Sequence, residues 1–304
     1  MDVAWAQWSS LTSAAAPVAQ KRAWAIVDPE ALVLLSLAFR ERERRLNDLT
    51  VGWARTGSSL LSVKRMNSLA GTYPDRVRQP LREFAWVAAE AGDKRWRVHG
   101  SPSAAEGPPV RAKDLGPLRL MEGPTLLLKL RAGFGVGSKA DLLTFLLGLH
   151  NAAASPKVIA VATEYSERAI RTAAEEMALG GLIEEVQGQP VAYRAEYRAW
   201  ASVLKLYQLK APDEGRPDVP PWRFWSVVFA FLVDVDAWAR QANQEGWSAY
   251  LASSRARDLM EQHAKKLRRV PVALPAPQRT RGAAYLDEFE ELTDRIREWI
   301  VESL

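Results

Sequence analysis

Apolar residues recur along most of the chain at the three- and four-residue spacing of helices, and only a few short stretches alternate as strands do. The longest apolar runs are ALVLLSLAF (31–39) and FWSVVFAFLV (224–233). Both fall short of the ~20 residues that a membrane-spanning helix needs, so we expect buried helices and no membrane partner. The pattern as a whole predicts a mainly α protein.

Residues 1–100 are predicted to form a helical N-terminal domain. Asp28 directly before Pro29 is typical of a helix start, because aspartate caps free backbone amides and proline suits the first turn. Helical spacing then covers residues 28–56, 60–71 and 74–92. The short stretch KRWRVHG (94–100) alternates and is predicted as a strand.

Residues 49–71 within this domain admit two interpretations. They form a degenerate helix-turn-helix whose second helix carries Lys64 and Arg65, or they are a helical scaffold that contacts no partner. The scaffold is the simpler of the two, and both stay open at this point.

Residues 138–196 carry a regular succession of elements. Ser138, with Asp141 three residues later, has the pattern of a capping box at the start of a first helix. A second helix is predicted from Pro156, and a third over residues 167–179. The third helix has one apolar stripe, formed by Ile170, Ala173, Ala174, Met177 and Ala178.

The same segment ends in a predicted hairpin. Gly180 and Gly181 stop the third helix, because glycine adopts the left-handed conformation that ends many helices. LIEEV and VAYRA then flank the turn QGQP as two short strands. Three helices followed by a β-hairpin make a winged helix.

Stretches rich in proline and glycine divide the chain. Residues 101–124 are predicted to be a linker, and further breaks fall at residues 211–222 and 270–282. We therefore expect a central winged helix-turn-helix domain over 125–200, flanked by two helical domains over 1–100 and 201–304.

The composition excludes several kinds of chemistry. The chain has no cysteine, which excludes disulfides, cysteine-held zinc and a thiol nucleophile. Its three histidines, His99, His150 and His263, lie far apart in sequence, so we expect no metal site and no cofactor. The lack of cysteine, and a start (MDVAWAQWSS) without the pattern of a signal peptide, fit a cytoplasmic protein.

Two motifs that suggest catalysis are incomplete. GFGVGSKAD (133–141) lacks the second glycine and the hydroxyl residue of a phosphate-binding loop. Asp234 and Asp236 would lie on different faces of one helix, so they would not share a metal ion. We therefore expect no catalytic residues and no enzyme.

The net charge of +5 is spread unevenly. Residues 1–100 hold 15 basic and 10 acidic residues, whereas residues 138–196 hold five basic and eight acidic ones. Residues 255–281 hold eight basic and two acidic residues, including a cluster of Lys265, Lys266, Arg268 and Arg269. This cluster is either a phosphate-contacting arm or a solvated face.

The stretch IAVATEYSERAIRTAAEEMALGGLIEE resembles the winged helix-turn-helix DNA-binding domains of prokaryotic transcriptional regulators, of the kind seen in the ArsR and MarR groups. The resemblance covers residues 138–196 only. It rests on an Ile-Ala pair in the second helix, Tyr-Ser at the turn, Ala-Ile-x-x-Ala in the third helix and Leu-Gly-Gly-Leu-Ile before the wing.

This resemblance implies that the third helix enters the major groove of double-stranded DNA. Its candidate base contacts are Ser166, Glu167, Arg168, Arg171 and Thr172. Lys157, at the start of the second helix, and Arg194, in the wing, are the candidate phosphate contacts. For each of these residues the alternative is a solvated surface without a partner.

We therefore expect a DNA-binding regulator that acts as a homodimer, since two-fold symmetry doubles a modest charged footprint. The alternative is a protein-interaction adaptor, or an antitoxin-like partner protein, in which the acidic winged helix docks a basic protein. The last helix is amphipathic, with Tyr285, Phe289, Leu292, Ile296 and Trp299 on one seam. It is predicted to pack on its own chain, and a contribution to a dimer stays open.

Overall fold

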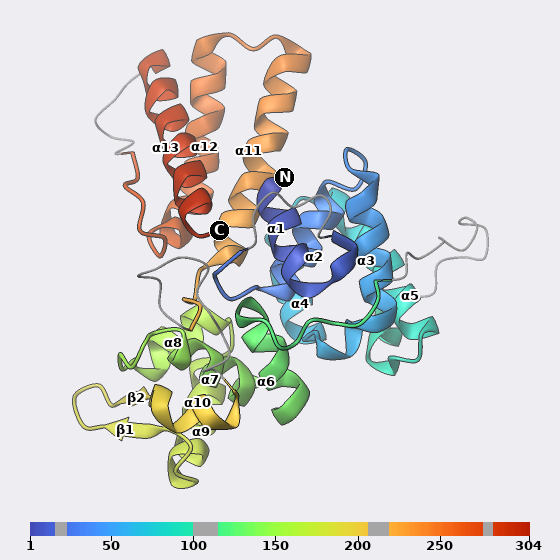
Figure 1. Ribbon diagram of the computed structural model, residues 1–304. Coiled ribbons are helices and arrows are strands. Elements are labelled where there is room, and N and C mark those ends of the chain that lie inside the picture. The colour runs from blue at the N-terminus through green and yellow to red at the C-terminus, as the bar shows by residue number, and fades with distance from the viewer. Residues whose placement is uncertain (16–22, 100–114, 206–218, 276–281) are drawn as a thin grey trace.

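The computed structural model describes residues 1–15, 23–99, 115–205, 219–275 and 282–304 (Figure 1). The described chain is mainly helical, as the apolar spacing predicts, and its sheet has two strands. None of the helices in these ranges is both long and apolar enough to cross a membrane. Most of the predicted linker over 101–124 lies outside the described residues, which resume at Leu115.

The first hundred residues form five α-helices in the described ranges: α1 Asp2–Leu11, α2 Pro29–Ala38, α3 Arg44–Thr56, α4 Val63–Ala70 and α5 Arg78–Glu90. Short 3-10 turns join them at Ser13–Ala15, Ser58–Leu60 and Asp75–Val77. Asp28 caps α2 as predicted, because its carboxylate accepts a hydrogen bond from the Ala31 amide at 3.1 Å.

The single helix predicted over 28–56 is wrong, because the structure breaks it between Ala38 and Arg44. Helix α2 is buried on all sides, whereas the next residues, RERERR (40–45), are charged and partly or fully exposed. Burial of charged side chains without partners costs free energy, so the chain turns at the surface here. Glu43 then caps α3 by accepting from the Arg45 amide at 3.3 Å.

The strand predicted over 94–100 is also wrong, since Lys94–His99 form a 3-10 helix. Asp93 explains the difference, because its carboxylate accepts from the Arg95 amide at 3.2 Å and from the Trp96 indole at 3.1 Å. Such local bonds favour a turn over a strand. The Trp96 ring then packs edge-on against Phe84 at 5.2 Å between ring centroids.

The middle of the chain forms η5 Gly123–Thr125, α6 Leu126–Phe134, α7 Ser138–Leu147, α8 Pro156–Thr163, α9 Glu167–Leu179, β1 Glu184–Val186, β2 Ala192–Arg194 and α10 Tyr197–Val203. The predicted helix bounds at Pro156 and over 167–179 are confirmed, and so is the antiparallel hairpin. The predicted capping box at Ser138 is wrong. Ser138 makes no capping hydrogen bond, and Asp141 turns inward to Arg131 instead.

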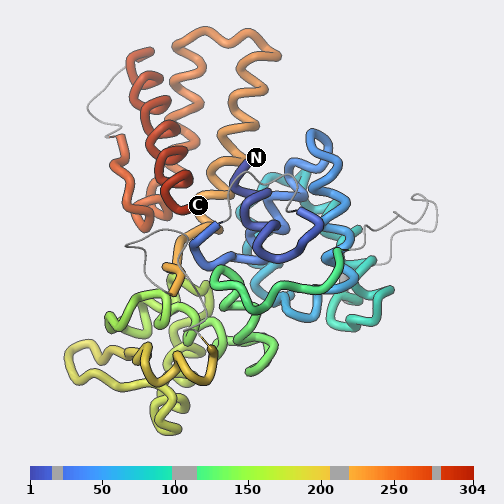
Figure 2. The backbone as a smooth tube through the Cα atoms, in the orientation of Figure 1, coloured from blue at the N-terminus to red at the C-terminus, as the bar shows by residue number. Residues whose placement is uncertain are grey.

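The last part of the chain forms three long helices, α11 Trp225–Glu245, α12 Ala249–Leu267 and α13 Tyr285–Glu302, with a 3-10 turn at Gly282–Ala284. The apolar seam of α13 is buried, as its predicted packing on its own chain requires. Figures 1 and 2 show these helices side by side at one end of the molecule, with α9 and the hairpin at the opposite end.

The buried apolar residues form two clusters. The first combines α1–α5 with α11–α13, so the first and last thirds of the chain share one core. The second lies within α6–α10 and includes Trp24 and Ile26 from the segment before α2. The indole of Trp225, at the start of α11, donates to the Ile26 carbonyl at 3.1 Å and so joins the two clusters.

Candidate nucleic-acid interface

Helix α9 exists because its sequence supplies a cap and a buried stripe. The Ser166 hydroxyl accepts from the Ala169 amide at 3.2 Å and so satisfies one of the free amides of the first turn. Ile170, Ala173, Ala174 and Met177 are buried in the second cluster, as the stripe predicts. The opposite face of α9 is therefore turned to solvent.

The predicted base-contacting residues all lie on exposed positions of α9 or its cap. Arg168 and Thr172 have no hydrogen bond or ion pair in the described part of the chain, so both are available to a ligand. Arg171 is different, because its guanidinium pairs with the Glu167 carboxylate at 2.9 Å, one helical turn away. The pair is exposed, and such pairs are worth only ~0.3–0.5 kcal/mol, so it would yield readily to a stronger partner.

Of the two predicted phosphate contacts, one is unpaired in the described part of the chain and the other is bound to a carboxylate. Lys157 is exposed in the first turn of α8 and has no ion pair within the described ranges. Arg194 lies opposite Glu184 in the hairpin register, and its guanidinium binds that carboxylate at 2.5 and 3.1 Å. Arg194 therefore joins the two strands of the hairpin, and its charge is already compensated.

The acid excess of residues 138–196 is smaller on the surface than in the sequence. Two of the eight acids, Asp141 and Glu164, point into the protein. Six acids and five bases remain outside. Lys139 pairs with Glu176 at 2.8 Å, as Arg171 and Arg194 pair with acids of their own. The surface of this segment is thus close to neutral, with Arg168 and Lys157 as its unpaired cations among the described residues.

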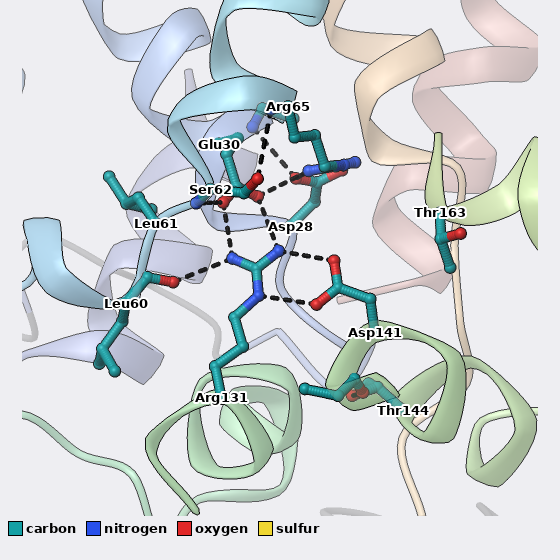
Figure 3. A network of polar contacts seen from close by, with 12 residues as sticks. Asp28, Glu30, Leu60, Leu61, Ser62, Arg65, Arg131, Asp141, Thr144 and Thr163 are labelled. Atoms are coloured by element: carbon teal, nitrogen blue, oxygen red, sulfur yellow. Dashed lines mark hydrogen bonds and ion pairs between the residues drawn. The ribbon is translucent and has the colours of Figure 1, made fainter. Parts of the chain in front are cut away.

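A network of buried charges lies behind this surface (Figure 3). Arg131 of α6 binds the Asp141 carboxylate with two nitrogens, at 2.8 and 2.7 Å, and the Glu30 carboxylate at 2.6 Å. Arg65 of α4 binds Asp28 with two nitrogens, both at 2.6 Å, and Glu30 at 2.7 Å. Glu30 therefore stands between two arginines.

Backbone groups complete the network. The Ser62 amide donates to Glu30 at 2.7 Å, and Arg131 donates to the Leu60 carbonyl at 3.0 Å. Burial alone would raise the pKa of Glu30, but the Arg131 and Arg65 guanidiniums outweigh that effect and lower this pKa. For Arg131, burial disfavours the charge, but the Asp141 and Glu30 carboxylates raise its pKa further above its ordinary value. Glu30 and Arg131 are thus both ionised at neutral pH.

This network fixes α6 and α7 against α2 and α4. It also decides how Arg65 can act, since the side chain is buried and bound to two carboxylates. Arg65 is therefore not a DNA contact, and the suggested second helix-turn-helix over 49–71 keeps only Lys64 as an exposed cation on its second helix. The isolated acids within PEALVLLSLA and ADLLTFLLG, and the arginine within LLLKLRAGF, were the signal of this network in the sequence.

The turn between α8 and α9 is tied to the last third of the chain. Glu164 has a left-handed backbone, with φ of 61°, and its carboxylate accepts from the Ser226 hydroxyl of α11 at 3.0 Å. Burial raises the pKa of Glu164, and the Arg65 guanidinium opposes this effect. The turn between α8 and α9 is thus held from α11, while α2 and α4 hold α6 and α7.

The basic cluster at the end of α12 lies beside α8. The Arg269 guanidinium is 3.5 Å from the Val161 carbonyl, near the end of α8. Lys265 and Arg268 are exposed, and neither has an ion pair within the ranges that the structure describes. The sequence alone did not indicate this proximity, because 108 residues separate Arg269 from Val161.

Comparison with known proteins adds no relative. No protein-family model, no curated protein and no solved structure matches this chain. In the described ranges, no three histidine or acidic side chains are grouped to hold a metal ion.

Proposed function

We propose that residues 138–196 form a winged helix-turn-helix and that the protein is a DNA-binding transcriptional regulator of the cytoplasm. The order of elements supports this fold. Between α7 and α8, Ala154 pairs with Tyr193 of β2 through two backbone hydrogen bonds of 2.9 Å. The hairpin thus has a third, one-residue strand beside it, which gives the succession helix, strand, helix, helix, strand, strand.

The single observation that carries the function is the exposed face of α9. Arg168 and Thr172 are one turn apart on this face and have no partner in the described chain, while its apolar stripe is buried. In the major groove, arginine pairs with guanine O6 and N7, and threonine contacts several bases. Arg171 would add a second guanine contact on release from Glu167, which can itself accept from cytosine N4.

The phosphate contacts in this proposal come from two parts of the chain. Lys157 marks the start of α8, and the cluster of Lys265, Lys266, Arg268 and Arg269 lies beside its end. Arg194 contributes less than the resemblance implies, because Glu184 compensates it. A homodimer would enlarge this footprint, but the seam of α13 is buried in its own chain, so the dimer would use another surface.

Selection of bound fragments from a random DNA pool, followed by fluorescence anisotropy at low and moderate salt, tests this proposal. We expect Arg168→Ala to weaken binding to the selected site by ~1–3 kcal/mol and to relax the preference at one base pair. Arg171→Ala should act in the same direction. Arg297→Ala, an exposed arginine on α13, is the matched control and should leave affinity unchanged.

The proposal fails if no fragment is retained even at low salt. It also fails if Arg168→Ala and Arg171→Ala both bind the selected site as tightly as the unmodified protein. Retention of DNA with unchanged base preference in both variants would assign binding to the phosphate contacts alone.

An adaptor that docks another protein is the second candidate. It is favoured by apolar side chains exposed on the same segment, with Val158 50%, Val161 39% and Leu179 91% exposed. Capture of partners from the protein's own cell lysate, with and without nuclease, separates the two functions. A partner that survives nuclease and is lost with Val158→Asp supports the adaptor, whereas loss of all partners on nuclease treatment supports DNA binding.

A further inference from the structure

An open cavity of about 480 Å³ lies where four parts of the chain meet. It is lined by the segment before α2, the connection between α7 and α8, the segment before α11 and the end of α13. Its lining includes the side chains of Trp24, His150, Trp222, Arg223 and Glu302. Cavities of ~300–1,000 Å³ are the size that small molecules occupy in proteins.

The walls of this cavity are firmly held. The Trp222 ring packs edge-on against Phe145 of α7, with 5.5 Å between centroids. His150 is fixed by a 2.8 Å hydrogen bond between Nε2 and the Val219 carbonyl. Gly148 allows the two backbones to approach, because a Cβ there would lie 2.9 Å from the Trp222 amide nitrogen. The cavity is therefore part of the fold, with little freedom to collapse.

Arg223 is the unusual group in this cavity. It is half-buried, yet no carboxylate in the described chain lies within ion-pair distance of it, in contrast to Arg65 and Arg131. Its Nε donates to the Ser303 hydroxyl at 3.3 Å, and its guanidinium lies 5.9 Å from the centre of the Trp299 ring. Its two terminal nitrogens make no hydrogen bond to the described residues.

The electrostatics of Arg223 agree with this geometry. Burial lowers the pKa of the guanidinium, and the more distant Glu302 carboxylate opposes this effect only in part. An arginine that has lost water without gaining a carboxylate favours an incoming anion. Its planar fork of donors fits a carboxylate through two parallel hydrogen bonds.

We propose that this cavity binds a small aromatic monocarboxylate. The carboxylate pairs with the terminal nitrogens of Arg223, and the aromatic ring packs against the edges of Trp24 and Trp222 that line the cavity. Glu302 is exposed at the edge of the cavity and repels a second negative charge, which favours a monoanion over a phosphate or a dicarboxylate. The proposed site does not depend on DNA binding.

The test compares three probes of one shape and different charge: indole-3-acetate, its neutral amide and the cation tryptamine. Isothermal titration calorimetry of the full chain should give a Kd for indole-3-acetate of about 1 mM or tighter, and binding at least about tenfold weaker for the amide. Tryptamine should bind no more tightly than the amide.

Variants locate the site. Arg223→Gln should weaken indole-3-acetate at least about tenfold and leave the amide unchanged. Trp222→Leu should weaken the acid and the amide alike. Arg297→Gln removes an exposed arginine from α13 and should change neither, and the melting temperature of each variant shows whether it folds.

Equal affinity of the acid and the amide for the unmodified protein would overturn the proposal, and so would no binding of the acid at about 10 mM. Undiminished binding of the acid by Arg223→Gln would overturn it as well. If Arg223→Gln does not fold, Arg223→Lys replaces it. Lys keeps the charge without the planar fork, so it should still weaken the acid selectively, and unchanged binding there would also refute the site.

Discussion

Single charged residues inside apolar helices decide how the parts of this chain fit together. Glu30 and Arg131 have no exposed side-chain surface, and each is paired with more than one opposite charge. Buried charges are costly to move from water, and they persist only where every partner is in place. The network therefore favours one arrangement of α2, α4, α6 and α7, because any other would break the buried contact between Arg131 and Glu30 that joins these helices.

Arg131→Met tests this role at the level of one residue. We expect the free energy of unfolding to fall by ~3–5 kcal/mol, because Asp141 would lose its only arginine among the described residues and Glu30 one of its two. Urea unfolding followed by circular dichroism measures the change. The exposed Arg297→Met is the control and should change stability by less than about 0.5 kcal/mol.

A second variant separates the loss of stability caused by the unpaired Asp141 charge from the loss caused by poorer packing. Arg131→Met combined with Asp141→Leu should recover part of the stability, because Glu30 keeps Arg65 at 2.7 Å while Asp141 no longer stands alone. A double variant that is less stable than Arg131→Met would contradict this explanation.

The sequence predicted the exposed residues of the candidate site better than the buried ones. Arg168 and Thr172 lie on the solvent face of α9 because a helical period alone fixes which residues share a face. The pairing of Arg131 with Glu30 spans 101 residues, and no local pattern records such a contact. The local pattern therefore predicts Asp141 as a helix-capping acid, whereas in the structure it faces Arg131.

At the scale of elements, α9 combines a structural and a proposed recognition role in its first turn. Ser166 was expected to contact bases, yet its hydroxyl is also the cap that accepts from the Ala169 amide. The two roles are separable by substitution, because aspartate caps a helix as well as serine does but carries a negative charge.

Ser166→Ala should lower the free energy of unfolding by about 1 kcal/mol, since it removes the cap. Ser166→Asp should retain stability, because an acid is favourable at a helix start, and it should weaken DNA binding through repulsion of phosphates. Thermal unfolding and fluorescence anisotropy on the same samples check both. Tight DNA binding by Ser166→Asp would place this turn away from the DNA.

Helices with clear caps and stops were predicted closely, whereas elements set by local polar contacts were not. Pro156 after Ser155 and the paired glycines after Leu179 mark their helix ends in sequence. The break between α2 and α3 depends on burial of α2 from every side, and the 3-10 turn at Lys94–His99 depends on the Asp93 carboxylate. Both causes arise from folded surroundings, so alternation and helical spacing alone gave the wrong element.

At the scale of the whole molecule, the surface proposed to meet DNA is not confined to residues 138–196. The end of α12 reaches α8 through Arg269, so cations from the last third of the chain lie next to α8. This arrangement offsets the near-neutral surface of residues 138–196.

The double variant Arg268→Gln/Arg269→Gln should weaken binding to all DNA sequences alike, because phosphate contacts carry no base preference. Each lost contact should reduce the slope of log affinity against log salt by about one, so the slope should fall by about two. Anisotropy titrations at several salt concentrations measure it. An unchanged slope would show that α12 stays clear of the DNA.

The position of Glu30 also bears on how this chain can evolve. Exchange of residues 125–200 for a segment of another protein by recombination would bring in a helix without the matching arginine and leave Glu30 with Arg65 as its only arginine partner. The reverse exchange, of residues 1–100, would leave Arg131 with the Asp141 carboxylate as its only acidic partner. Either hybrid loses the buried contact between Glu30 and Arg131 and leaves one side of it without its partner, so the segment is expected to be inherited together with its neighbours and not shuffled between proteins as a free module.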